Sequence, residues 1–263
     1  MGEYIFIGIL ILIVAVLMSM VGKGGGNFYV LILAMLHVPM HTAAATGQFI
    51  LFASSFVALI IFHQKKIVSF PHLFFIAPIM AVSAFFGGYF SHIFSELVLK
   101  LIFAGMLILA GVILLINITP REEKVKKKGS NSYIANKLDF NINIFFVIMI
   151  LIITGIGSGM VGTAGGSFVV PLLVYICGMN LKMAIGTSSA LISSTAFMGF
   201  SGHLIRGNFN MSWMIPLALI AIVGGFVGGK FAIASKRDNL KFIFSYSNFL
   251  AAGLMIINVM IHH

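Results

Sequence analysis

Residues 20–30 read Met-Val-Gly-Lys-Gly-Gly-Gly-Asn-Phe-Tyr-Val, and residues 160–170 read Met-Val-Gly-Thr-Ala-Gly-Gly-Ser-Phe-Val-Val. The two stretches align without a gap at an offset of 140 residues, and both lie within long apolar sequence. A glycine-rich break at matched points of two duplicated membrane halves is typical of the central substrate site of a transporter. These stretches therefore predict both the fold class and the place of the site.

The composition of the chain is that of a membrane protein. Of its 263 residues, 60% are hydrophobic and only 8% are charged, which is far outside the range of soluble globular domains. The apolar runs have the length of membrane helices and lack the alternation of a β-barrel, so we expect an all-α polytopic membrane protein. The net charge of +10 is explained by loop lysines facing an anionic membrane surface, and no nucleic-acid partner is expected.

The chain divides into two similar halves. The polar linker 119–140 separates an N-terminal membrane repeat, 1–118, from a C-terminal membrane repeat, 141–263. The offset continues beyond the glycine motif, since His63 aligns with His203, and we interpret the halves as an internal duplication. Apolar segments are expected at about 4–20, 27–37, 42–62, 70–91, 97–118, 142–161, 167–178, 183–204, 211–234 and 241–261.

The topology depends on how residues 4–37 cross the membrane. A straight helix of this length would extend about 50 Å, beyond a hydrocarbon core of about 30 Å. Either the segment crosses once as a broken, tilted element and the halves are parallel, or it turns back at the glycines and the halves are inverted. In the first case, nine loop lysines and arginines lie on one side of the membrane and five on the other. In the second case, twelve lie on one side and two on the other. The positive-inside rule favours inverted repeats in the inner (plasma) membrane, with a cytoplasmic linker and both termini outside.

The two breaks favour the binding of an anion. A helix that restarts at about Asn27 or Ser167 points its free amides and the positive end of its dipole at the break. Two such ends near the midplane would attract an anion, and Lys23 is the cation at the first break. The predicted substrate-binding residues are Lys23, Gly24, Gly25, Gly26, Asn27, Thr46, Gln48, Thr163, Gly165, Gly166, Ser167, Thr187, Ser188 and Ser189.

Some glycines and polar residues of the apolar segments have a structural role as their expected or alternative role. The pairs Gly87-Gly88, Gly224-Gly225 and Gly228-Gly229 are interpreted as helix-packing positions. Lys23 could instead snorkel to an interface or cap carbonyls. His63, His203 and Arg206 are predicted to form a proton-sensitive gate, and the alternative is that the histidines bond carbonyls at the membrane interface.

The positions of the acidic residues disfavour cation transport. All six lie near segment ends or in loops, at Glu3, Glu96, Glu122, Glu123, Asp139 and Asp238, whereas proton and sodium pumps usually carry an intramembrane carboxylate. No nucleophile–base pair or metal cluster is evident in the sequence, so neither an enzyme nor a cofactor is expected. The alternatives are a passive anion channel that uses the same site and a transporter of another small organic anion.

At these motifs the chain resembles the sulfite exporter TauE/SafE family of membrane transporters. The matching residues are Met160-Val161-Gly162, Gly165-Gly166-Ser167, Pro171, Ala184 to Ser189, Gly202-His203 and Arg206-Gly207. The first half departs from this pattern, since Lys23 interrupts the glycine run and Leu31 stands in place of Pro171. The resemblance implies transport of sulfur-containing anions such as sulfite, thiosulfate, sulfoacetate and other organosulfonates. The expected partners are a small anionic substrate and membrane lipid, and a homodimer is left open.

Overall fold

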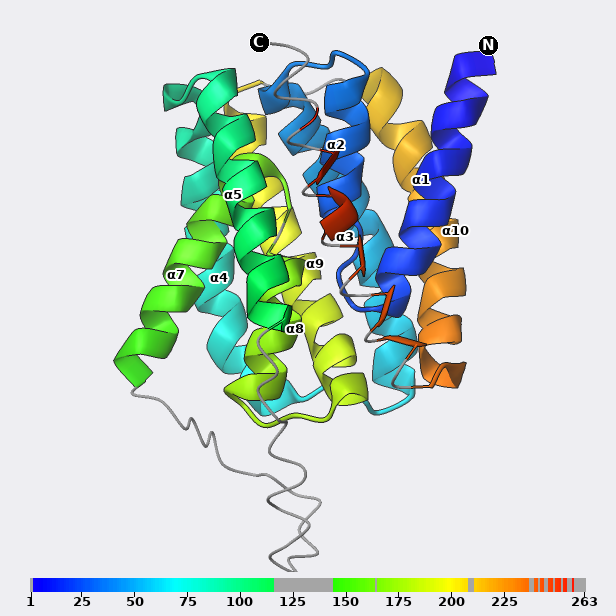
Figure 1. The fold of residues 1–263 in the computed structure, drawn as a ribbon, viewed down its shortest axis with the longest axis vertical. Coiled ribbons are helices and arrows are strands. Elements are labelled where there is room, and N and C mark those ends of the chain that lie inside the picture. The colour runs from blue at the N-terminus through cyan, green and yellow to red at the C-terminus, as the bar shows by residue number, and fades with distance from the viewer. Residues whose placement is uncertain are drawn as a thin grey trace, which may run out of the picture.

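The computed structural model describes residues 2–115, 144–163, 165–207 and 211–236, and part of the segment 239–257. Every regular element in these residues is a helix (Figure 1). The helices are α1 (Gly2–Met20), α2 (Gly26–Met35), α3 (Met40–Gln64), α4 (Phe70–Phe90), the short 3-10 helix η1 (Ser91–Ile93), α5 (Glu96–Leu115), α7 (Ile144–Val161), α8 (Gly166–Tyr175), α9 (Leu181–Ile205) and α10 (Met211–Ala234). The predicted linker 119–140 lies outside the described residues.

The predicted apolar segments that fall on described residues are helices, with ends within about three residues of the expected ones. Among the described residues, four helices are long and apolar enough to cross a membrane: Met40–Gln64, Phe70–Ile93, Leu181–Ile205 and Met214–Ala234. The expectation of an all-helical membrane protein is therefore confirmed.

Residues 4–37 form a hairpin and not one straight element. In Figure 1, α1 runs inward from the end of the molecule where the N-terminus lies, and α2 returns toward that end. The pair α7 and α8 makes the same hairpin from the opposite end. With ten residues each, α2 and α8 extend only about 15 Å, half the thickness of a hydrocarbon core.

The long helices of the two halves run in opposite directions. In Figure 1, α3 descends from the N-terminal end while α9 ascends toward it, and α4 and α10 are likewise opposed. The helices of the halves are also interleaved. Helix α4 packs against α7 and α9, α10 packs against α1 and α3, and α3 packs against α9. The halves of the sequence therefore do not form separate bundles in space.

Glycines allow these helices to approach closely. A Cβ on Gly87 would collide with the carbonyl of Ile156 in α7, and a Cβ on Gly225 would collide with the carbonyl of Ser54 in α3. The helix-packing role predicted for these glycine pairs is confirmed. Outside this core, large apolar side chains such as Phe74 and Ile153 are exposed, as expected for a surface in contact with lipid.

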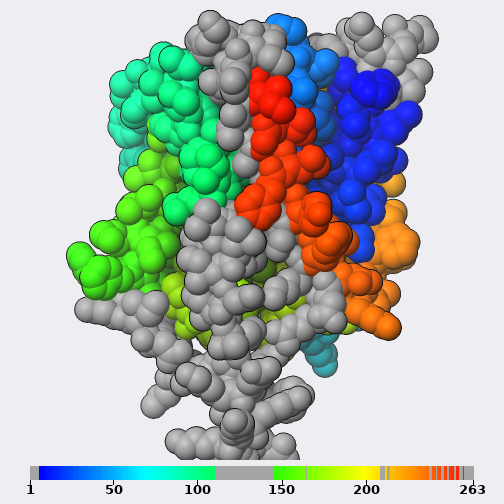
Figure 2. Space-filling view, viewed as in Figure 1, coloured from blue at the N-terminus to red at the C-terminus, as the bar shows by residue number. Residues whose placement is uncertain are grey.

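The described part of residues 239–257 lies between α1 and α5 on the face shown in Figure 2. Ala251 and Ser247 are buried in this segment, while Tyr246 and Leu250 are exposed. The segment therefore covers the centre of the molecule, where the two hairpins meet.

Candidate functional site

Each hairpin turns at a glycine that ends its first helix. Gly22 has a φ of 72° and Gly162 a φ of 84°, in the left-handed region that side chains rarely adopt. Two hydrogen bonds close the turns: the Lys23 amide donates to Met18 O at 3.0 Å, and the Thr163 amide donates to Ser158 O at 3.1 Å. This arrangement satisfies carbonyls that the ends of α1 and α7 would otherwise leave unpaired in an apolar environment.

The second helix of each hairpin begins without a side-chain cap. The N-cap residues of α2 and α8 are Gly25 and Gly165, with φ of 94° and 68°. A glycine offers no side-chain acceptor to the amides of the first helical turn. Those amides, and the positive end of each helix dipole, are therefore directed at the space beside the turn, where they favour an anion.

The two hairpins touch where their second helices begin. A Cβ on Gly26 would lie 3.1 Å from the carbonyl oxygen of Thr163. A Cβ on Gly166 would lie 2.7 Å from the carbonyl oxygen of Lys23. Each contact joins the start of α2 or α8 to the turn of the other hairpin. Because neither glycine has a side chain, the N-termini of α2 and α8 can lie close together.

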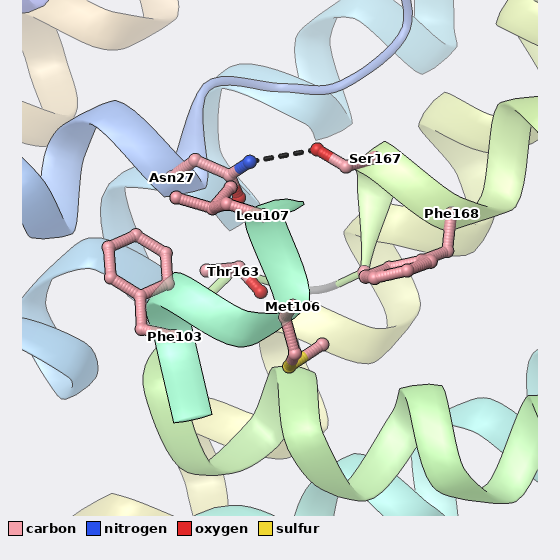
Figure 3. Close-up of a pocket in the computed structure, with 8 residues that line it drawn as sticks. Asn27, Phe103, Met106, Leu107, Thr163, Ser167 and Phe168 are labelled. Atoms are coloured by element: carbon pink, nitrogen blue, oxygen red, sulfur yellow. Dashed lines mark hydrogen bonds between the residues drawn. The ribbon is translucent and has the colours of Figure 1, made fainter. Parts of the chain in front are cut away.

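A direct hydrogen bond links these two helix N-termini. The side-chain nitrogen of Asn27 donates to the hydroxyl oxygen of Ser167 at 2.8 Å, and both side chains are buried (Figure 3). The two residues occupy matching positions in the hairpins, because their numbers differ by 140. The prediction that they lie at one site is thus consistent with their contact.

A small pocket lies beside this contact. Its cavity volume is about 10 Å³, which is room for about one water molecule. Both polar groups and apolar side chains of α5 and α8 line it (Figure 3). The lining residues are Asn27, Thr163, Gly165 and Ser167 together with Phe103, Met106, Leu107 and Phe168. In the described part of the chain, no group of three or more His, Cys, Asp or Glu side chains could hold a metal ion.

Lys23 lies beside this pocket but does not line it. Its side chain is only 4% exposed, and its ammonium nitrogen donates to the hydroxyl of Ser247 at 2.7 Å. The lysine therefore joins the first glycine turn to the segment that covers the centre of the molecule. Its backbone borders the start of α8 through the contact with Gly166.

Two predicted site residues support the hairpins. The hydroxyl of Ser188 donates to the carbonyl of Gly22 at 2.7 Å, and the amide nitrogen of Gln48 donates to the carbonyl of Gly159 at 2.8 Å. Each side chain thus binds the end of the first helix of the other half's hairpin. The amide oxygen of Gln48 is buried and has no hydrogen-bond partner among the described residues.

The model of the family described as sulfite exporter TauE/SafE matches residues 7–255. The chain belongs to this family.

Relatives within the TauE/SafE family carry only general names. The probable membrane transporter protein YdhB of Bacillus subtilis is 22% identical over 230 residues, covering 87% of this chain and 90% of that protein. The probable membrane transporter protein YunE of the same organism is 24% identical over 249 residues, covering 89% of each chain. A probable membrane transporter protein of Methanocaldococcus jannaschii, MJ0441, is 24% identical over 229 residues, covering 80% of this chain and 78% of that protein. No solved structure matches the chain.

Other predicted site residues lie away from the pocket lining. The hydroxyl oxygen of Thr187 accepts the amide of Ser69 at 2.9 Å, and Ser189 donates to a carbonyl of its own helix. Arg206 places its guanidinium 4.1 Å from the centre of the Tyr89 ring. Predicted residues that are buried but do not line the pocket also include Thr46, Gly24, Gly25, Gly26 and Gly166.

The two histidines of this TauE/SafE member have different environments. His203 is fully buried, with Nε2 at 2.9 Å from the carbonyl of Gly159 and Nδ1 at 3.3 Å from the hydroxyl of Ser91. Because a carbonyl oxygen only accepts, we assign a proton to Nε2. His63 is exposed and packs edge-on against Phe70. Although the two histidines match in sequence, only His203 contacts the end of α7.

Sequence reasoning missed the apolar lining of the pocket and the partner of Lys23. Phe103 and Leu107 are buried, but in an apolar segment their types do not distinguish a site-facing side chain from a lipid-facing one. Ser247 carries a clearer signal, because the run Tyr-Ser-Asn at 246–248 interrupts the last apolar segment. A hydroxyl within such a segment is expected to face the protein interior.

Proposed function

We propose that this membrane transporter of the TauE/SafE family carries a small sulfur-containing anion, bound between the N-termini of α2 and α8. The observation that carries this proposal is the Asn27–Ser167 hydrogen bond, because it brings two glycine-capped helix N-termini to one point. Each helix N-terminus acts as roughly half a positive charge. The family description, sulfite exporter, supports a sulfur oxyanion as the substrate.

We further propose that the two halves are inverted repeats and that transport occurs by alternating access. The opposed directions of α3 and α9 support this (Figure 1). The exchanged contacts, Gly26 with Thr163 and Gly166 with Lys23, are those that a two-fold relation between the hairpins would produce. In such a transporter, one group of helices moves against the other around a fixed midplane site.

The proposed function is tested by thermal unfolding of the purified protein across a panel of anions at fixed ionic strength. The panel contains sulfite, thiosulfate, sulfoacetate, taurine, sulfate, acetate and chloride. A specific ligand at a hundred times its Kd stabilises the folded state by about 2.7 kcal/mol, so we expect a saturable rise in Tm with at least one sulfur anion and none with chloride. If no sulfur anion raises Tm, the sulfur assignment is wrong.

The proposed orientation makes a prediction about residues 125–132, which lie outside the described residues. Of the described basic residues at helix ends, Lys65 and Lys182 lie at the same end of the bundle, because α3 ends and α9 begins there (Figure 1). With this end in the cytoplasm, a single cysteine introduced in 125–132 should resist an impermeant maleimide in intact cells and react after lysis. The background is Cys177→Ser, which removes the native thiol, and rapid labelling in intact cells would reverse the orientation.

We also propose that His203 senses protons for the gate. Its Nε2–H donates to Gly159 O, and Nδ1 lies 3.3 Å from the hydroxyl oxygen of Ser91, which itself donates to Gly88 O at 2.8 Å. A charged ring would carry a proton on Nδ1 and could donate it to the Ser91 oxygen. Protonation would then add a hydrogen bond to Ser91 and alter the connection between α9 and η1. We expect the pH dependence of transport between about pH 5 and 8 to flatten in His203→Ala and to persist in His63→Ala. Identical pH profiles for wild type and His203→Ala would exclude the gate.

A further inference from the structure

The side chain of Gln48 in α3 is bonded to the end of α7. It is 0% exposed, and its amide nitrogen donates to the carbonyl of Gly159 at 2.8 Å and to that of Ser158 at 3.2 Å. Both carbonyls belong to the last turn of α7, just before the glycine turn at Gly162. Gln48 does not line the pocket beside the two helix N-termini, so its contact is with the hairpin itself.

The two carbonyls have other donors besides Gln48. The oxygen of Ser158 also accepts the backbone amides of Gly162 and Thr163, at 3.0 and 3.1 Å. The oxygen of Gly159 also lies 2.9 Å from Nε2 of His203. Each carbonyl would therefore keep a hydrogen bond without Gln48, and the end of α7 does not require this side chain to satisfy its buried polar groups.

The amide of Gln48 is also unfavourable for stability. Its oxygen is buried and has no hydrogen-bond partner among the described residues, and an unsatisfied buried acceptor destabilises the folded state. The amide also occupies a gap in α9, because a Cβ on Gly199 would lie 2.3 Å from its oxygen and 2.7 Å from its nitrogen. A methionine of similar length would carry no such acceptor. A polar group that breaks the rules of packing in this way is expected at a place that serves function.

The carbonyl of Ser158 connects Gln48 to the N-terminus of α8. It closes the second glycine turn by accepting the amides of Gly162 and Thr163, and α8 follows directly after this turn. Helix α3 contacts the same turn one helical turn earlier, since a Cβ on Gly162 would lie 2.6 Å from the Cα and the carbonyl oxygen of Ala44. Ala44 and Gln48 together fix where the second turn lies against α3.

We propose that Gln48 is a positioning residue, and not a ligand of the anion: it holds the second glycine turn and thereby directs the N-terminus of α8 at the site. This inference rests on the proposed function, because it assumes that the anion binds between α2 and α8. The first hairpin is held by a different group, since Ser188, which follows Gln48 by 140 residues, donates to the carbonyl of Gly22. Loss of Gln48 should therefore affect the second turn and spare the first.

The test is Gln48→Met in the full-length protein, with hydrogen exchange and thermal unfolding as readouts and sulfite as the probe. We expect the amides of residues 162–168 to exchange faster than in the wild type and those of residues 22–28 to be unchanged. The Tm without anion should equal or exceed that of the wild type, because the variant removes an unsatisfied acceptor and leaves both carbonyls bonded. The half-saturating concentration of sulfite should rise by about two- to tenfold, which corresponds to one net hydrogen bond.

Two further variants sharpen this test. Gln64→Met is the matched control, because Gln64 is exposed at the end of the same helix, and it should leave all three readouts unchanged. Gly199→Ala acts on Gln48 from the opposite side. The three atoms nearest to its new Cβ all belong to the amide of Gln48, so this change should displace the amide and also speed exchange at residues 162–168.

The possible results separate this inference from the proposed function. Unchanged exchange at residues 162–168 in Gln48→Met would exclude the positioning role. A lower Tm with faster exchange throughout the protein would also exclude it, because Gln48 would then serve packing in general. Wild-type affinity for sulfite despite faster local exchange would mean that this turn does not shape the site. If sulfite fails to stabilise the wild type while exchange changes as expected, Gln48 still positions the turn and the proposed binding of sulfite fails.

Discussion

Replacing Gly166 with alanine is expected to abolish anion-induced stabilisation, although alanine is the better helix former. Intrinsic propensity favours alanine over glycine inside a helix by about 1 kcal/mol. At this position the new methyl group would lie 2.7 Å from the carbonyl oxygen and 3.0 Å from the Cα of Lys23. Because both atoms belong to the backbone, the first glycine turn must shift, and the Asn27–Ser167 hydrogen bond would be lost with it.

The control for Gly166→Ala is Gly105→Ala in α5. Among the described residues, nothing beyond the neighbouring backbone of its own helix lies within 4 Å of a Cβ at Gly105. This change should therefore leave anion binding intact and raise stability by up to about 1 kcal/mol. Measurement of Tm with and without the anion distinguishes the two variants. Wild-type affinity in Gly166→Ala would mean that the contact between the hairpins does not shape the site.

Replacing Lys23 with methionine is expected to weaken anion binding by roughly tenfold. In an effective dielectric of about 20, the attraction between two unit charges that are not in direct contact is on the order of 1 kcal/mol. Methionine keeps the apolar stem of the side chain and removes the ammonium group that donates to Ser247. The substitution should therefore reduce mainly the affinity for the anion and have less effect on packing. The change in affinity is measured as the shift in the anion concentration at which the rise in Tm is half-saturated.

Lys230→Met is the matched control for Lys23→Met. Lys230 is exposed, and its ammonium nitrogen lies 4.0 Å from the centre of the Phe226 ring. The same loss of charge at this surface position should leave the half-saturating concentration unchanged, since exposed charges are screened by salt. An unchanged value in Lys23→Met as well would remove Lys23 from the site.

The helices and their glycine breaks could be predicted from sequence because their signals are local. Apolar runs of membrane length determine where helices form, and the repeated Gly22 and Gly162 mark the turns. That Asn27 and Ser167 lie at one site could also be predicted, because the duplication pairs these positions. Each of these inferences needs only the order of residues along the chain and the rules of helix termination.

The surroundings of the site could not be predicted in this way because they depend on packing. The sequence gives no direct sign that Lys23 reaches Ser247, a residue 224 positions away. Ser188 and Thr187 look alike in sequence, yet the first holds a glycine turn and the second binds the amide of Ser69. Which hydroxyl faces a ligand is decided by the rotation of α9 against its neighbours, and local pattern does not determine that rotation.

The interleaving of the helices has a consequence for the order of assembly during synthesis. Helix α4 leaves the ribosome before its packing partners α7 and α9 have been synthesised. Helices α1 and α3 likewise have no contact with α10 until α10 has been synthesised. Until then the close-packing surface at Gly87, which later meets the backbone of α7, faces lipid or the insertion machinery. The first half of the chain is therefore an unfinished intermediate, and these contacts are not complete until α10 enters the membrane.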